Sequence, residues 1–300
     1  MVAIHEFPPR EQGKEPRKAF LPVEARDSDE RADLQLLRAR LLDAAGTKSQ
    51  DALRAAKQAY EARFPDEHEA IETLFGVVNF LDTQKTIEEL RARDGRAPQE
   101  LWHSLTEYNF TLTHFVETNG ENRIFLDSFW RLFEDIGERW GGRGGVETVK
   151  KLHAGTVVQA GVSHAFKRAF YENVKSSLPD EDMRRATDLW VEGRPVQIKG
   201  AKRDKPEFIE VDTMTYPATV VRDGNQELLF TAHRDEKLDW LSLNVKRYSE
   251  RIGRGMKAYF VVVPYRMVDW VTGEPTEELI EYFRAHAPVG SVSEKRREAA

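Results

Sequence analysis

A glycine-rich stretch, "GGRGG" at Gly141–Gly145, separates two parts of the chain that have different hydrophobic patterns. Before it, apolar residues recur at the three- and four-residue spacing of a helix face, as at Leu34, Leu37 and Leu41. After it, segments with helical spacing alternate with short runs rich in β-branched and aromatic residues. Because a run of glycines interrupts regular structure, we expect a domain boundary or hinge there, between an all-helical region and a region that mixes helices and strands.

The chain is therefore predicted to have three parts. Residues 1–28 are rich in proline and charge and are expected to form a flexible arm. Residues 29–145 are expected to form a helical domain, and residues 146–300 a second domain of the α/β (α+β) class. The second domain should contain a helix (148–175), a hairpin (189–198), strands at 208–213, 218–221 and 228–232, a helix ending at Gly253, a buried strand (258–264) and a helix after Pro275.

The composition is that of an ordinary water-soluble globular protein, with 40% hydrophobic and 32% charged residues. The first twenty residues have no apolar signal-peptide core, and no uninterrupted apolar run reaches membrane-spanning length. The absence of cysteine excludes disulfides, cysteine-ligated metals and thiol nucleophiles. We expect a cytoplasmic protein without membrane contact.

The net charge of −6 conceals an uneven distribution. Residues 1–150 carry 21 Lys and Arg against 28 Asp and Glu, whereas residues 151–300 carry 24 against 23. Within Arg194–Lys205 there are five basic residues and one acid. Since local charge sets the affinity for phosphates, this stretch is a candidate nucleic-acid contact; the alternative is a solvated basic loop.

The stretch "ATDLWVEGRPVQIKGAKR", residues 186–203, is predicted to form a tight β-hairpin. Gly193 would be the first central residue of a type II′ turn, so that Val191 faces Val196 and Asp188 faces Lys199. Alternation puts one apolar set on the first face: Leu189, Val191, Val196 and Ile198. The other face then carries Asp188, Trp190, Gln197 and Lys199, which brings an acid, a carboxamide and an amine together.

This arrangement resembles the PD-(D/E)xK nuclease superfamily, whose α-β-β-β-α-β core hydrolyses phosphodiesters. The motif stands here as Asp188, Gln197 and Lys199, with Thr187 where the family name has proline and Gln197 where an acid is usual. Within the superfamily, residues 155–290 are similar to type II restriction endonucleases of the Taq I kind. The segments that carry this likeness are "GVSHAFKRAFYENV", "VQIKGAKR" and "RYSERIGRGMKAYFVVVPYRMVDWVTGEPTEELIEYFRAHAP". The hairpin from Asp188 to Gln197 is shorter than in that family.

The resemblance implies a Mg²⁺ site built on the hairpin. Asp188 would be the carboxylate ligand, and Gln197 and the backbone carbonyl of Ile198 would complete the protein ligands or hold a metal-bound water. Glu172 is a further acid near the metal in this interpretation, or else a solvated glutamate. Lys199 would act on the attacking water or on the phosphate. A simple Asp188–Lys199 ion pair, with a stabilisation of about 1 kcal/mol or less, is the alternative without catalysis.

Basic residues around this site are the candidate DNA contacts. Those expected to bind phosphates or bases are Lys202, Arg203, Lys205, His233, Arg234, Arg247, Arg251 and Arg254. Arg251 and Arg254 would alternatively complement the dipole at the end of their own helix. His164 has no metal-ligand spacing and is expected at the surface or in the core.

The sequence thus predicts a Mg²⁺-dependent type II restriction endonuclease that cleaves double-stranded DNA at a specific short sequence. A homodimer suits a palindromic target, and a cognate DNA methyltransferase is expected in the host. A branch-cutting or methyl-directed nuclease with the same core is one alternative. A catalytically degenerate DNA-binding protein is the other.

Overall fold

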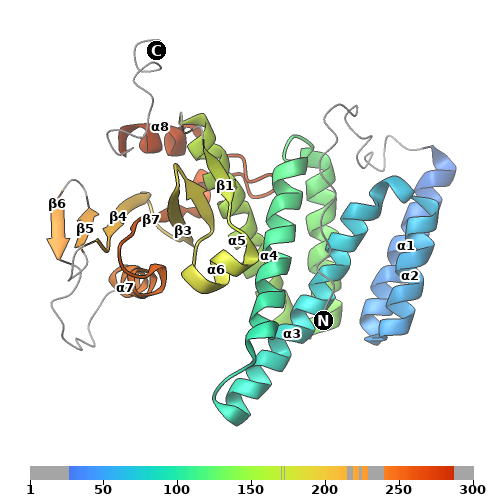
Figure 1. The fold of residues 1–300 in the computed structure, drawn as a ribbon. Helices are drawn as coiled ribbons and strands as arrows, with labels where there is room; N and C mark the ends of the chain where they lie inside the picture. Colours follow the sequence, from blue (N-terminus) through green and yellow to red (C-terminus); the bar gives the residue numbers. More distant parts are fainter. Residues whose placement is uncertain are drawn as a thin grey trace.

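The computed structural model describes residues 27–169, 171, 173–214, 219–222, 225–228 and 240–286. In this part of the chain the fold is of the mixed α+β class, as predicted, with a group of helices at one end and a sheet flanked by helices at the other (Figure 1). None of the described helices has a stretch long and apolar enough to cross a bilayer.

The first part is helical, as the spacing of its apolar residues predicts. It contains α1 (Ser28–Thr47), α2 (Gln50–Arg63), the short 3₁₀ helix η2 (Pro65–Glu67), α3 (His68–Asp94), α4 (Gln99–Asn119) and the beginning of α5 (Arg123–Arg168). Side-chain caps explain where the first two helices begin: Asp27 accepts from the backbone of Asp29 and Glu30, and Ser49 accepts from Ala52 N. The predicted stripe of α1 is buried.

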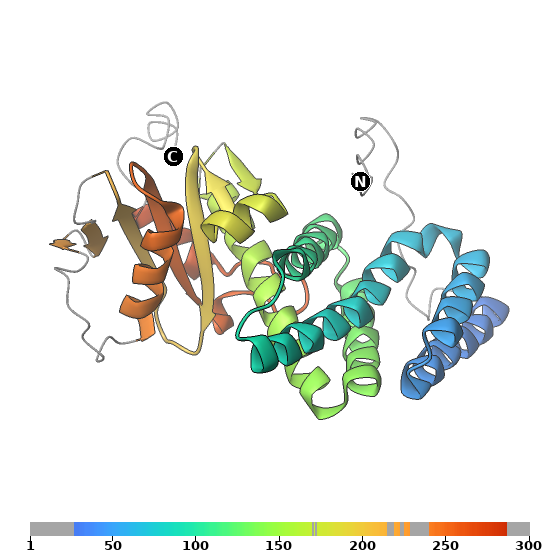
Figure 2. The same ribbon diagram turned by 60° about the horizontal axis from the view of Figure 1, so that its bottom comes forward.

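Helix α5 contains the glycine-rich stretch and turns back on itself there. Gly142 has φ 63° and ψ −151°, which is not helical. A Cβ on Gly145 would lie 2.5 Å from the carbonyl oxygen of Gly137, and the rings of Trp130 and His153 stack at 3.8 Å. Residues on either side of the glycines therefore touch, and α5 is two packed arms joined by a tight turn (Figure 2). The predicted break in the helix exists at Gly142, and the glycines connect two helical arms that pack against each other; a domain boundary or hinge there stays a prediction.

The second part contains one sheet within the described residues. Its elements are β1 (Val174–Ser176), α6 (Pro179–Arg185), β2 (Leu189–Val191), β3 (Arg194–Ala201), β4 (Glu207–Asp212), β5 (Thr219–Arg222), β6 (Asn225–Leu228), α7 (Trp240–Ile252), β7 (Lys257–Pro264), the 3₁₀ helix η3 (Tyr265–Met267) and α8 (Glu277–His286). The strand order is β1-β2-β3-β7-β4-β5-β6, and β3 pairs with β7 in parallel while the other pairs are antiparallel.

Several predicted bounds were wrong. The helix expected over 148–175 ends at Arg168, and residues 174–176 form β1 instead. Helix α6 was not predicted, because "SSLPDED" was taken only as the end of the preceding helix. The last strand of the β5–β6 hairpin begins at Asn225, earlier than the predicted 228, and residues 229–232 lie outside the described chain.

Helices cover both faces of the sheet. Buried residues of β2 and β3 join those of α5 and α8 in one hydrophobic cluster, and α7 packs on the other face against Phe260, Val262 and Ile209. The first cluster also contains residues of α1 to α4, from Leu34 onward. The helical part and the sheet therefore share a hydrophobic core.

Candidate active site

The β2–β3 hairpin has a different turn from the one predicted. Glu192 and Gly193 both have positive φ, 48° and 73°, and Val191 pairs with Arg194. These are the features of a two-residue type I′ turn, with glycine at its second central position. The predicted register is therefore wrong by two residues. The faces are nevertheless as predicted, because a shift of two residues preserves the alternation of side chains.

The corrected register brings Asp188 next to Gln197. The Asp188 backbone N–H donates to Val196 O at 2.8 Å, which extends the pairing of β2 and β3 by one residue. Oδ2 of Asp188 accepts hydrogen bonds from Gln197 Nε2 and from the backbone N–H of Ile198, the latter at 2.6 Å. Gln197 and Ile198 thus hold the Asp188 carboxylate through their N–H groups. Metal ligation by their carbonyl oxygens stays a prediction.

Asp188 and Lys199 line one pocket of about 390 Å³. Gln159 of α5 lies in its wall and donates to the backbone carbonyl of Asp188 at 3.2 Å. Residues of the sheet, of α6 and of the helical part contribute the rest of the lining: Asp182, Ile198, Gly200, Phe80, Gln84, Asn109, Thr113, Thr148, Lys151, Leu152, Gly155, Thr156 and Val158. The structure therefore brings the predicted acid and amine together in a concave site.

The charges in this pocket influence one another. Burial raises the pKa of Asp188, against the opposing effects of Lys199 and of the N–H groups of Ile198 and Gln197. Burial and the nearby Asp188 raise the pKa of Asp182 to about 7, although Arg251 and Lys199 act in the other direction. Two neighbouring half-buried carboxylates that disfavour simultaneous ionisation are stabilised by a proton or by a cation between them. The oxygen donors thus fit a hard divalent cation such as Mg²⁺.

Asp182 and Gln159 were missed by the sequence reasoning. A signal for Asp182 exists: Pro179 followed by three acidic residues is typical of the first turn of a helix, directly before β2. Glu181 holds this helix in place, because its Oε2 accepts from Leu178 N at 3.0 Å and from Trp190 Nε1 at 2.9 Å. For Gln159 the spacing on α5 gives no sign of which face meets the pocket.

The predicted DNA contacts have different surroundings. Lys202, Lys205, Arg247 and Arg254 are exposed. Arg203 is half-buried and pairs with Glu207 at 2.6 Å. Arg251 donates to the backbone carbonyls of Asp182 and Met183, at 3.1 and 2.5 Å, so it caps the end of α6. Arg251 is itself exposed and stands in the last turn of α7, so its predicted roles in binding DNA and in complementing the dipole of its own helix stay predictions.

Three predicted site residues lie outside the described chain: Glu172, His233 and Arg234. Most of the predicted N-terminal arm, residues 1–26, lies outside it too. His164, expected at the surface or in the core, is half-buried near Glu274.

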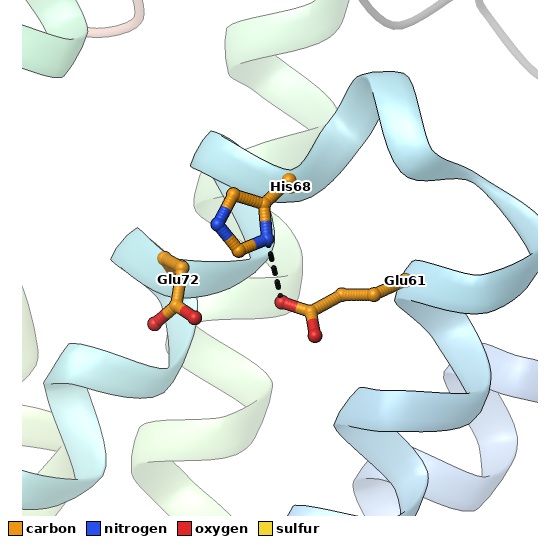
Figure 3. A group of neighbouring side chains, drawn as sticks. All are labelled: Glu61, His68 and Glu72. Carbon is orange, nitrogen blue, oxygen red and sulfur yellow. Dashed lines mark hydrogen bonds and ion pairs between the residues drawn. The ribbon is translucent and has the colours of Figure 1, made fainter.

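A second group of possible ligands lies in the helical part. Glu61, His68 and Glu72 converge at the junction of α2 and α3 (Figure 3), with His68 Nδ1 at 2.9 Å from Glu61. The ammonium group of Lys57 pairs with Glu72 and lies 3.7 Å from Glu61. Because Lys57 already lies within ion-pair distance of both acids, we assign the group as a surface ion-pair cluster.

Comparisons of the chain with family models, with curated proteins and with solved structures gave no match.

Proposed function

We propose that the protein is a Mg²⁺-dependent DNA endonuclease of the PD-(D/E)xK kind, acting as a type II restriction enzyme. The observation that carries the proposal is the pocket in which Asp188 and Lys199 meet, with Asp188 fixed by Gln197 and Ile198. The order of elements around it supports the same conclusion. It runs α5, β1, β2, β3, α7 and β7, apart from α6 and the β4–β6 addition, and so repeats the helix, three strands, helix and strand of that core.

In this proposal the residues of the pocket have different roles in phosphodiester hydrolysis. Asp188 would hold the metal through the oxygen that Gln197 and Ile198 leave free, and these two donors keep its carboxylate in one orientation. The bound ion would supply positive charge to the phosphate and lower the pKa of a ligated water. Lys199, which lines the same pocket as the two acids, would donate to a non-bridging phosphate oxygen or take the proton of the attacking water.

The substrate we propose is double-stranded DNA with a short specific sequence. Exposed Lys202, Lys205 and Arg247 are suited to phosphate contacts, which position the duplex without reading it. A homodimer would cut both strands of a palindrome, and a host methyltransferase would protect the same sites.

The test is cleavage of unmethylated phage DNA with and without Mg²⁺. The wild type should give discrete fragments with Mg²⁺ and none in chelator. Asp188→Asn and Lys199→Met should each lower the cleavage rate by at least about 100-fold, since each removes a group that acts on the reacting atoms. Lys175→Met, an exposed lysine on β1, is the control and should cleave like the wild type.

Normal cleavage by Asp188→Asn would refute the mechanism. Binding of DNA by the wild type without any cleavage would instead favour a degenerate DNA-binding protein. Random products, or products only from branched or hemimethylated DNA, would favour the other nucleases of this core.

A further inference from the structure

The hairpin by itself offers few oxygens to a dication. One oxygen of Asp188 already accepts from two N–H donors, and the amide at position 197 brings no charge. Mg²⁺ sites in proteins usually combine one or two carboxylates with waters and substrate phosphate, and each negative charge that is lost weakens them. A second carboxylate in the pocket would therefore change its affinity for the ion.

Helix α6 carries three acids in sequence, and two of them have structural partners. Asp180 lies 3.0 Å from His103 of α4, and Glu181 binds Leu178 N and Trp190. Asp182 lines the pocket together with Asp188 and Lys199. In the part of the chain that the structure describes, its carboxylate makes no hydrogen bond or ion pair, while its backbone N–H and carbonyl are both bonded.

We propose that Asp182 is the second carboxylate of the metal site and binds the divalent cation together with Asp188. This inference rests on the proposed function and extends it, because it gives the metal site an acid from α6 in place of the acid missing at Gln197. Asp182 then touches the ion directly, whereas Gln197 orients Asp188.

The electrostatics of the pocket agree with this assignment. Burial and Asp188 disfavour the charged form of Asp182 and raise its pKa to about 7. A cation shared by both carboxylates would remove that repulsion. Arg251 keeps Asp182 in place from outside, through its bonds to the carbonyls of Asp182 and Met183.

The experiment is calorimetric titration of the full chain with Mg²⁺ and with Mn²⁺ alone, without DNA. Asp182→Asn should weaken cation binding by about 10-fold or more, and Asp188→Asn should do the same, because each loses a charged ligand. Asp180→Asn is the matched control, since that acid is on the same helix but outside the pocket, and it should bind like the wild type. Thermal unfolding with and without Mg²⁺ should show the same ranking of ion-induced stabilisation.

The outcomes separate this inference from the function on which it rests. Wild-type affinity in Asp182→Asn, together with weakened binding in Asp188→Asn, would overturn the role of Asp182 and leave the proposed function standing. A wild type that binds neither ion would overturn both. If Asp182→Asn fails to fold, as judged by circular dichroism, Asp182→Ser is titrated in its place and is held to the same expectation.

Discussion

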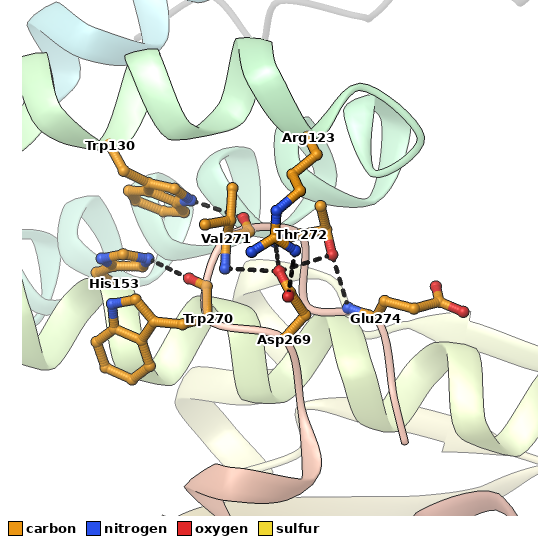
Figure 4. A network of polar contacts seen from close by, with 8 residues as sticks. All are labelled: Arg123, Trp130, His153, Asp269, Trp270, Val271, Thr272 and Glu274. Carbon is orange, nitrogen blue, oxygen red and sulfur yellow. Dashed lines mark hydrogen bonds and ion pairs between the residues drawn. The ribbon is translucent and has the colours of Figure 1, made fainter. Parts of the chain in front are cut away.

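His153 lies buried between Trp130 and Trp270, where the second arm of α5 meets the loop that follows β7 (Figure 4). Its ring is 3.8 Å from that of Trp130 and 4.8 Å from that of Trp270, and Nε2 lies 2.8 Å from the carbonyl oxygen of Trp270. Burial lowers the pKa of His153, and the contacts with Trp270 and Glu134 offset this only in part. Because the pKa of His153 is lowered in the folded state, we expect the free energy of unfolding to depend on pH through this group.

The direction of this pH dependence follows from the pH at which the folded and the unfolded chain each bind a proton at His153. The unfolded chain binds a proton at His153 near pH 6.5, whereas the folded chain binds it only at lower pH. Stability should therefore be unaffected by this group above about pH 6.5. It should decline as the pH falls below that value, by at most about 1.4 kcal/mol per unit, until the folded pKa is reached.

Urea unfolding of the wild type and of His153→Gln, measured between pH 8 and pH 5, tests this prediction. The free energy of unfolding of the wild type should fall relative to that of the variant as the medium becomes acidic. The same substitution at exposed His114 controls for the loss of a histidine. A difference between wild type and His153→Gln that does not change with pH would contradict it.

At the scale of elements, the turn in α5 depends on the close approach of its two arms. A Cβ at Gly145 would lie 2.5 Å from the backbone oxygen of Gly137, and backbone cannot move aside as a flexible side chain can. At Gly144, one residue earlier, a Cβ would meet nothing within 4 Å. Gly145→Ala should therefore lower the free energy of unfolding by about 1–3 kcal/mol. Gly144→Ala should leave it unchanged or raise it by up to about 1 kcal/mol.

Urea denaturation of the two variants decides this point, because they add the same methyl group to neighbouring positions. Equal stabilities would mean that the arms of α5 do not pack as closely as described. A larger loss in Gly144→Ala would have the same meaning.

The elements also show which features a sequence can predict. The apolar run of β7 and the stripe of α1 were predicted correctly, because burial on both faces or on one helix face leaves a strong periodic signal. The hairpin register was not, because alternation with a period of two cannot distinguish Lys199 from Gln197 as the neighbour of Asp188. Only the type of turn sets the register. Gly193 suits both the predicted type II′ turn, as its first central residue, and the observed type I′ turn, as its second.

For the whole molecule, the pocket joins parts of the chain that are far apart in sequence. Gln84 of α3, Asn109 of α4 and Lys151 of α5 line it together with Asp188 and Lys199. The motif on the hairpin was predicted because its residues are only eleven positions apart. The pocket wall that the helices form, with Gln84, Asn109 and Lys151, was not predicted, because no spacing in the sequence shows which face of a helix packs toward the sheet. The helical part therefore encloses one side of the candidate active site, a role that could not be predicted from the sequence.

Substitution of Lys151 tests whether the helical part contacts DNA. Lys151 is exposed, lies on the pocket side of α5 and is two helical turns, or about 12 Å, from Gln159, which contacts Asp188. A duplex whose scissile phosphate reaches Asp188 would therefore bring another phosphate of the same duplex within reach of the Lys151 ammonium group.

Lys151→Met should weaken DNA binding for all sequences alike and reduce the slope of log K against log salt by about 0.9, the value for one lost phosphate contact. Lys150→Met is the matched control, because Lys150 is also exposed but lies outside the pocket, and its salt slope should equal that of the wild type. Binding is measured in the Asp188→Asn background so that the DNA stays intact. If both lysines change the slope equally, the helical part attracts DNA only through its general charge and its enclosing wall does not contact the substrate at a defined point.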